Sequence, residues 1–123
     1  MFHHRVKEGV FKCTLCPERC DIKVGERGRC LARSASPSGV ILGAYGKITN
    51  LAVEPIEKKP IFHYKPNSRV LSLSSYGCNC ECVWCQNFTV SQVDKFDKAK
   101  DYMPIDLVNL AKEKNANGIC FFC

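Results

Sequence analysis

The carboxyl-terminal part of the chain combines two short apolar runs with one amphipathic stretch. Residues 69–75 read RVLSLSS and residues 118–122 read GICFF, and both runs are typical of buried strands. Between them, residues 103–118 read MPIDLVNLAKEKNANG, which places apolar side chains on one helical face, with proline near the start and Asn-Gly at the end. The pattern predicts a strand, a loop, a helix and a second strand, that is, a βαβ unit within a parallel sheet.

Residues 34–68 show a less regular pattern of apolar and polar positions. Residues 40–45 (VILGAY) and 47–53 (KITNLAV) are short strand candidates on either side of Gly46, and we expect them to form a hairpin. Residues 34–39 (SASPSG) are typical of a turn. Residues 54–68 contain three prolines and no apolar period, which predicts an irregular connector.

The amino-terminal residues carry a different pattern, because residues 9–33 are rich in cysteine, glycine and charge. We expect a small, mainly β module that something other than a hydrophobic core holds together. The predicted organisation is a cysteine-rich entry module with its connector at residues 1–68, followed by an α/β core domain that begins at residue 69 and is incomplete at residue 123. The chain stops inside an apolar run, which we interpret as a truncation.

Composition changes this picture mainly through cysteine, of which the 123 residues include ten. The start of the chain lacks the apolar run of a secretory signal, and no stretch approaches the ~20 apolar residues of a membrane span. We therefore expect a cytoplasmic protein whose thiols are reduced, where close cysteine pairs more often bind metal than form disulfides. The formal charge of +6 is spread along the chain, so neither a nucleic acid nor a membrane is an expected partner.

Residues 75–87, SYGCNCECVWCQN, directly follow the first predicted strand. Cys78, Cys82 and Cys85 are separated by three and two residues, so a short loop carries three thiolates that can surround one iron–sulfur cluster. Three protein ligands leave one iron open, as catalytic metal sites require. An S-adenosylmethionine molecule can bind such an iron through its amino and carboxylate groups.

This cysteine stretch resembles the cluster motif of radical S-adenosylmethionine enzymes. Further stretches, notably EPIEKKP at residues 54–60 and CQN at residues 85–87, are similar to relatives of pyruvate formate-lyase activating enzyme, in particular the AmmeMemoRadiSam system radical enzymes. The resemblance extends from about Cys13 to Cys123. It implies the first part of a partial (β/α) barrel, a 4Fe–4S cluster, S-adenosylmethionine as cofactor, flavodoxin or ferredoxin as reductant, and a protein as a possible radical acceptor.

The resemblance also assigns individual residues. Cys78, Cys82 and Cys85 match the cluster ligands, Trp84 matches an aromatic position beside the cofactor's adenine, and Asn87 matches a polar position after the ligands. Trp84 is otherwise a loop aromatic that covers the cluster, and Asn87 is otherwise a turn or helix-cap residue.

Cys80 departs from the family pattern, which has an apolar residue there. We expect Cys80 to be a small buried substitute for that residue, rather than a fourth ligand that would fill the open iron. No catalytic acid or base can be named from the sequence.

A second group consists of four cysteines in the entry module: Cys13, Cys16, Cys20 and Cys30. Four thiolates complete a tetrahedral zinc site or ligate a second iron–sulfur cluster, and either role leaves no open position. We expect a structural metal at this group.

Two signals remain outside these groups. The charged residues Glu54, Glu57, Lys58 and Lys59 are expected to form a structural turn rather than a catalytic group. Cys120 and Cys123, separated by two residues, are expected to be buried strand thiols on opposite faces.

The leading hypothesis is thus a radical S-adenosylmethionine enzyme of the activating-enzyme type, present as an incomplete chain that is itself inactive. The alternatives are a non-catalytic zinc or iron–sulfur binding module and an iron–sulfur electron carrier.

Overall fold

The computed structural model describes residues 2–122, which form two compact units. Met1–Tyr45 and Tyr76–Phe96 make up one unit, and Gly46–Ser75 and Asp97–Cys123 make up the other. The sequence predicts one boundary, at residue 68. In the structure, the residues of the cysteine loop instead belong to the same unit as the amino-terminal residues.

The first unit is built from two small antiparallel sheets. Strands β1 (His3–Lys7), β2 (Val10–Cys13) and β3 (Asp21–Lys23) pair in sequence order, and β4 (Arg33–Ser36) pairs with β5 (Gly39–Leu42). The mainly β character predicted for the entry module is therefore confirmed. The turn expected at residues 34–39 is shorter than predicted, because Arg33–Ser36 is a strand and only the residues between β4 and β5 turn.

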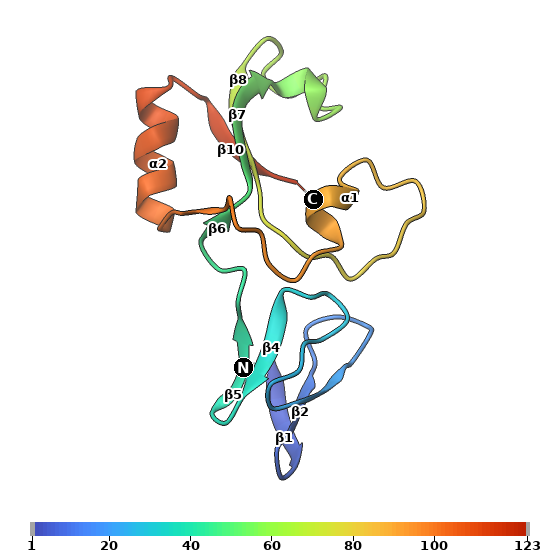
Figure 1. The fold of residues 1–123 in the computed structure, drawn as a ribbon. Helices are drawn as coiled ribbons and strands as arrows, with labels where there is room; N and C mark the ends of the chain where they lie inside the picture. The colour runs from blue at the N-terminus through green and yellow to red at the C-terminus, as the bar shows by residue number, and fades with distance from the viewer. Residues whose placement is uncertain (1, 123) are drawn as a thin grey trace. The chain divides into compact units, whose positions relative to one another are not determined.

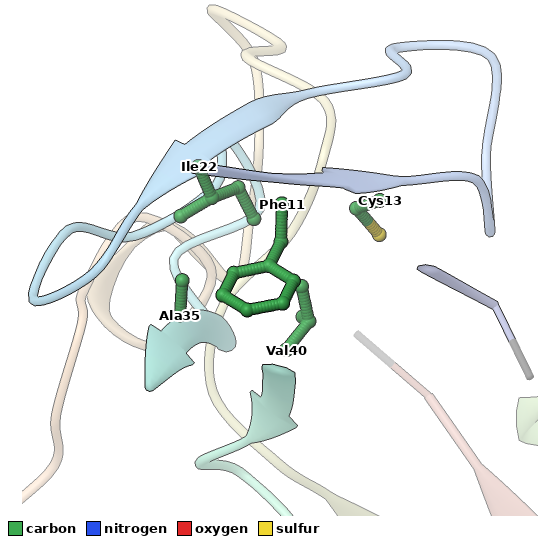
Figure 2. Packing of buried hydrophobic residues seen from close by; sticks show 5 residues of the cluster. All are labelled: Phe11, Cys13, Ile22, Ala35 and Val40. Atoms are coloured by element: carbon green, nitrogen blue, oxygen red, sulfur yellow. The ribbon is translucent and has the colours of Figure 1, made fainter. Parts of the chain in front are cut away.

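A hydrophobic cluster lies between these two sheets, and its buried members are Phe11, Cys13, Ile22, Ala35 and Val40. Figure 2 shows the Phe11 ring reaching from β2 toward Val40 and Ala35, with the Cys13 side chain beside it. Cys20 packs against the cluster from outside. The expectation of a module without a core is wrong, because alternation along β2 and β3 directs apolar side chains from both strands to one face.

The second unit contains a three-stranded sheet in the order β10-β8-β7, formed by Gly118–Phe121, Arg69–Ser74 and Asn50–Pro55. Strand β8 is antiparallel to β7 and parallel to β10, and α2 (Pro104–Glu113) lies beside this sheet in Figure 1. Leu71 and Leu73 of β8 are fully buried and pack with Leu107 and Ala111 of α2. The predicted βαβ unit is confirmed, but its sheet is mixed rather than parallel, because β7 is antiparallel to β8.

Two short elements complete this unit: β6 (Lys47–Ile48) pairs with β9 (Lys100–Asp101), and the 3-10 helix η1 (Ile56–Lys58) follows β7. Among the described residues, no helix has the length and apolar composition that crossing a membrane requires.

Several sequence predictions need correction. The hairpin expected around Gly46 does not form, because β5 pairs with β4 while residues 50–55 pair with the distant strand β8. The connector predicted from residue 54 begins as the end of β7. The strand predicted at residues 118–122 spans Gly118–Phe121 and is not buried, since it is an edge strand whose residues alternate between half-buried and exposed. Cys120, predicted to be buried, is half-buried, and Cys123 lies outside the described residues.

The predicted helix also ends early, at Glu113 instead of near residue 118. Asn115 adopts a left-handed φ of 52°, which ends the helix, and Asn117 exchanges hydrogen bonds with Arg69 at the start of β8. The predicted start is confirmed, because Pro104 occupies the first turn and the Asp106 carboxylate accepts the Met103 N–H at 2.9 Å.

Candidate metal centre

The cysteine loop occupies residues 75–87, which contain no helix or strand and connect β8 to the short helix α1 (Phe88–Ser91). Within it, the Cys85 N–H donates to the Cys82 carbonyl at 3.1 Å, so the last two predicted ligands lie on one turn. The Gly77 N–H donates to the Val90 carbonyl at 2.9 Å, which ties the start of the loop to α1. The loop is therefore folded back on itself, with its backbone bonded locally.

The three predicted cluster ligands are all free thiols. Cys82 is exposed, whereas Cys78 and Cys85 are half-buried. The Cys85 Sγ lies 3.3 Å from the Oγ of Ser91, a residue of α1 that is only 2% exposed. A buried hydroxyl at this distance can donate a hydrogen bond to a thiolate, and such bonds tune a bound metal.

Cys80 differs from its prediction, because it is exposed rather than buried. Its N–H lies 3.5 Å from the Cys78 Sγ, and its carbonyl accepts a hydrogen bond from Gln92 Nε2 at 2.7 Å. The pKa of the Cys80 thiol is raised, chiefly by the charge of Cys78 and to a smaller extent by that of Cys82. The position is open to solvent, so the expectation that Cys80 is a small buried residue is wrong.

The thiols are not gathered into a ready-made cage. Across residues 2–122, no group of three or more histidine, cysteine, aspartate or glutamate side chains lies close enough to hold a metal ion. The donor set itself suits a cluster, since the three thiols are free, soft ligands on an irregular loop with at least partial access to solvent. The assignment of Cys78, Cys82 and Cys85 as ligands stays a prediction.

The two residues predicted near the cofactor lie on the same loop. Trp84 is 82% exposed, so its ring face is open rather than packed in a core. Asn87 immediately precedes α1, and its carbonyl accepts hydrogen bonds from Val90 at 3.0 Å and Ser91 at 2.9 Å. Asn87 thus begins the helix through its backbone, while a cofactor contact by either residue stays a prediction.

In the amino-terminal group, a backbone hydrogen bond joins two of the four cysteines. The Cys13 N–H donates to the Cys20 carbonyl at 2.8 Å, and both residues contact the core of their unit. Cys16 and Cys30 are half-buried and free. The four-ligand site stays a prediction, and Cys13 in addition has a packing role that the spacing did not reveal.

Sequence reasoning missed the charged residues around the loop. Arg29 forms ion pairs with Glu18 at 3.5 Å and with Glu81 at 3.3 Å, and Arg27 pairs with Asp94 at 3.3 Å. Glu18 lies between Cys16 and Cys20, and Glu81 lies between Cys80 and Cys82. No local pattern identifies these pairs, because the partners of each arginine are distant in the sequence or lie on another loop.

The charged residues of the EPIEKKP stretch form a turn, as predicted. Glu54 accepts hydrogen bonds from Lys58 and, at 2.7 Å, from Lys59, while the Glu57 carboxylate accepts the Asn67 N–H at 2.6 Å. The two lysines lower the pKa of Glu54 to about 2. Each of the four charged residues therefore has a partner within this turn or at Asn67.

Comparison with known proteins adds one relative. The chain is similar to the uncharacterized protein MJ0808 of Methanocaldococcus jannaschii, with 38% identity over 122 residues. The match covers 98% of this chain and 37% of that protein, so the chain spans little more than a third of the relative's length. No family model and no solved structure matches the chain.

Proposed function

We propose that this chain carries the cluster-binding part of a radical S-adenosylmethionine enzyme, with Cys78, Cys82 and Cys85 as the protein ligands of a 4Fe–4S cluster. The observation that supports this most is the position of three free thiols on an irregular loop directly after the carboxyl end of β8, a strand that has a parallel neighbour. Binding sites of α/β folds form at the carboxyl ends of parallel strands.

The chemistry of the bound group defines the reaction class: the reduced cluster supplies the electron that cleaves a carbon–sulfur bond of S-adenosylmethionine and starts radical chemistry. The chain's own residues would bind the cluster and the cofactor and adjust the properties of the cluster. Ser91 is placed to donate a hydrogen bond to the Cys85 sulfur, and the exposed Trp84 ring offers an apolar face for an adenine. Asn87 is proposed as the polar residue on the cofactor side of α1.

The partners of the proposal come from the resemblance. They are a flavodoxin or ferredoxin as reductant and a protein as radical acceptor, in a cytoplasmic reaction of the activating-enzyme type. The match to a much longer relative supports placing the substrate-binding residues outside this chain. We therefore propose that this chain binds the cluster and does not turn over S-adenosylmethionine by itself.

Anaerobic reconstitution with ferrous iron and sulfide tests the proposal. The wild-type chain and Cys120→Ala, which removes a thiol outside the loop, are expected to take up the same iron and sulfide. Cys82→Ala is expected to lose most of both, and added S-adenosylmethionine should change the electron paramagnetic resonance spectrum of the reduced wild-type cluster. Equal iron and identical spectra for wild type and Cys82→Ala would exclude the three-ligand assignment.

The second candidate is a non-catalytic zinc or iron–sulfur binding module. The pair Cys13 and Cys20 favours it, because a backbone hydrogen bond joins two of the four cysteines whose number matches the ligands of a structural zinc site. This function predicts zinc without iron after anaerobic purification. An electron-carrying module instead predicts a redox-active cluster whose spectrum does not respond to S-adenosylmethionine.

A further inference from the structure

One arginine joins the two cysteine loops of the first unit. The Arg29 Nη2 lies 3.3 Å from the Glu81 carboxylate, and its Nη1 lies 3.5 Å from the Glu18 carboxylate. Glu81 is flanked by Cys80 and Cys82, and Glu18 lies in the loop between Cys16 and Cys20. A planar guanidinium has separate donors for two carboxylates, which a lysine does not offer in the same geometry.

A second arginine, Arg27, contacts the residues that follow the cysteine loop and α1. The Arg27 Nε lies 3.3 Å from the Asp94 carboxylate, which follows α1, and its Nη1 donates to the Leu31 carbonyl at 3.3 Å. Arg29 therefore contacts the cysteine loop at Glu81, and Arg27 contacts the residues just after α1 at Asp94. We call these two arginines the arginine clasp.

The segment that carries the clasp is anchored on the core. Gly28, between the two arginines, is buried, and a Cβ on it would lie 3.0 Å from the Ile22 Cδ1 and 3.7 Å from the Cys20 Sγ. The cysteine loop lies directly on the same segment, because a Cβ on Gly77 would approach the Cys30 carbonyl oxygen to 2.5 Å. Backbone contact and ion pairs thus act on the loop together.

The ion pairs are partly exposed, so they contribute little to global stability. Their effect is local, because Glu81 is adjacent to a predicted ligand in a loop that no helix or strand orders. Restricting such a loop before the metal binds lowers the entropy cost of ordering it on binding.

We propose that Arg29 is a positioning residue of the cysteine loop: by holding Glu81 it limits the motion of Cys82 and its neighbours, and by holding Glu18 it links the cysteine loop to the amino-terminal cysteine module. This inference rests on the proposed cluster site. It assigns the entry module a role as the platform on which the cluster loop is held.

The test is the rate at which the reconstituted chain loses iron to an added chelator under anaerobic conditions. Arg29→Ala and Glu81→Ala are each expected to speed the loss about tenfold, as for other residues that orient metal ligands. The double variant should be no faster than Arg29→Ala, because Arg29→Ala already removes the contact with Glu81. Arg29→Lys should lie between wild type and Arg29→Ala. Lys23→Ala, which removes the exposed pair with Glu26 elsewhere in the unit, is the matched control and should match wild type.

The outcomes separate the two proposals. If the wild-type chain takes up no cluster, the proposed function fails and the inference fails with it. If wild type binds a cluster and both single variants lose iron at the wild-type rate, the inference alone is overturned. Additive effects in the double variant would also overturn it. The metal-free variants are expected to have the same stability against urea as the metal-free wild type. Should Arg29→Ala fail to fold, Glu81→Ala tests the same ion pair through its other partner.

Discussion

At the scale of single residues, Gly77 decides how the cysteine loop leaves β8. Its φ of 82° lies in the left-handed region, and the Cys30 carbonyl and Ala32 N–H occupy the space of a side chain. A non-glycine residue would therefore meet both backbone strain and a steric clash at the position directly before Cys78.

We expect Gly77→Ala to destabilise the chain by about 2–4 kcal/mol and to reduce cluster uptake, because the loop must move away from residues 30–32. Gly25→Ala is the matched control: Gly25 has a similar φ of 88° but nothing within 4 Å of its added Cβ, so only the conformational cost of about 1 kcal/mol applies. Urea unfolding measures both variants. Equal destabilisation would show that contact with the Cys30 carbonyl does not matter.

Glu54 predicts a pH dependence of stability. Its pKa is lowered from 4.5 to about 2, mainly by hydrogen bonds from Lys58 and then Lys59, so the carboxylate stabilises the fold above about pH 4.5 and loses this contribution as the pH falls toward 2. We expect Glu54→Gln to cost about 1–2 kcal/mol at pH 7 and little at pH 2, since Glu54 is partly buried but Lys58 is largely exposed.

Urea unfolding of the metal-free chain between pH 2 and pH 7 checks this, with Glu113→Gln on an exposed face of α2 as control. A stability difference between wild type and Glu54→Gln that stays constant over this range would contradict the assignment.

At the scale of elements, β2 supports both the core and the cysteine chemistry of the first unit. Phe11 is 6% exposed at the centre of the cluster, and the same strand ends at Cys13. Since alternation places Phe11 and Cys13 on one face, loss of the ring also loosens the strand end that carries a predicted ligand.

Phe11→Ala should therefore destabilise the first unit by about 3 kcal/mol, the usual range for a buried phenylalanine. Phe2→Ala, at a position 62% exposed, should cost much less. Hydrogen exchange resolves the effect by region: protection is expected to fall in β2 and β3 and to persist in β8. Unchanged protection in β2 would show that this cluster does not hold the unit together.

Elements with a strong local signal could be predicted, and those that depend on distant partners could not. Pro104 and the apolar face identified α2, and the apolar run identified β8. The partner of residues 50–55 was missed, because a short strand next to a glycine favours a local hairpin until the buried strand β8 competes for it. The helix end was missed because Asn115 adopts the left-handed conformation.

The candidate site divides in the same way. The spacing and the family resemblance selected the three thiols, because both depend on residues that are close in the sequence, and their assignment as ligands stays a prediction. The exposure of Cys80, the Ser91 hydroxyl and the Arg29 ion pairs depend on folding and left no trace in the pattern.

At the scale of the whole molecule, all the described cysteines except Cys120 belong to one compact unit. The predicted cluster loop and the predicted structural group therefore belong to the same compact unit, although 47 residues separate Cys30 from Cys78. Two metal groups within one unit are coupled whenever filling one orders residues that the other needs.

Metal analysis of cysteine variants tests this coupling. Anaerobically reconstituted wild type is expected to hold about four irons at the loop, together with zinc or further iron at the amino-terminal group. Cys16→Ser combined with Cys30→Ser spares the buried Cys13 and should remove the second metal. Because loss of the second metal frees residues 30–32, whose backbone contacts Gly77, we expect this variant also to lower iron at the loop at least about twofold.

Cys120→Ser is the matched control, since it removes a half-buried thiol from the other unit and should leave both metals in place. Elemental analysis together with a sulfide assay distinguishes zinc from cluster iron. If the Cys16 and Cys30 variant retained the zinc, iron and sulfide contents of wild type, the amino-terminal cysteines would be packing residues. Cys13 of β2 already has this role in the hydrophobic cluster. Loss of the second metal with full iron at the loop would instead confirm the second site and exclude its coupling to the first.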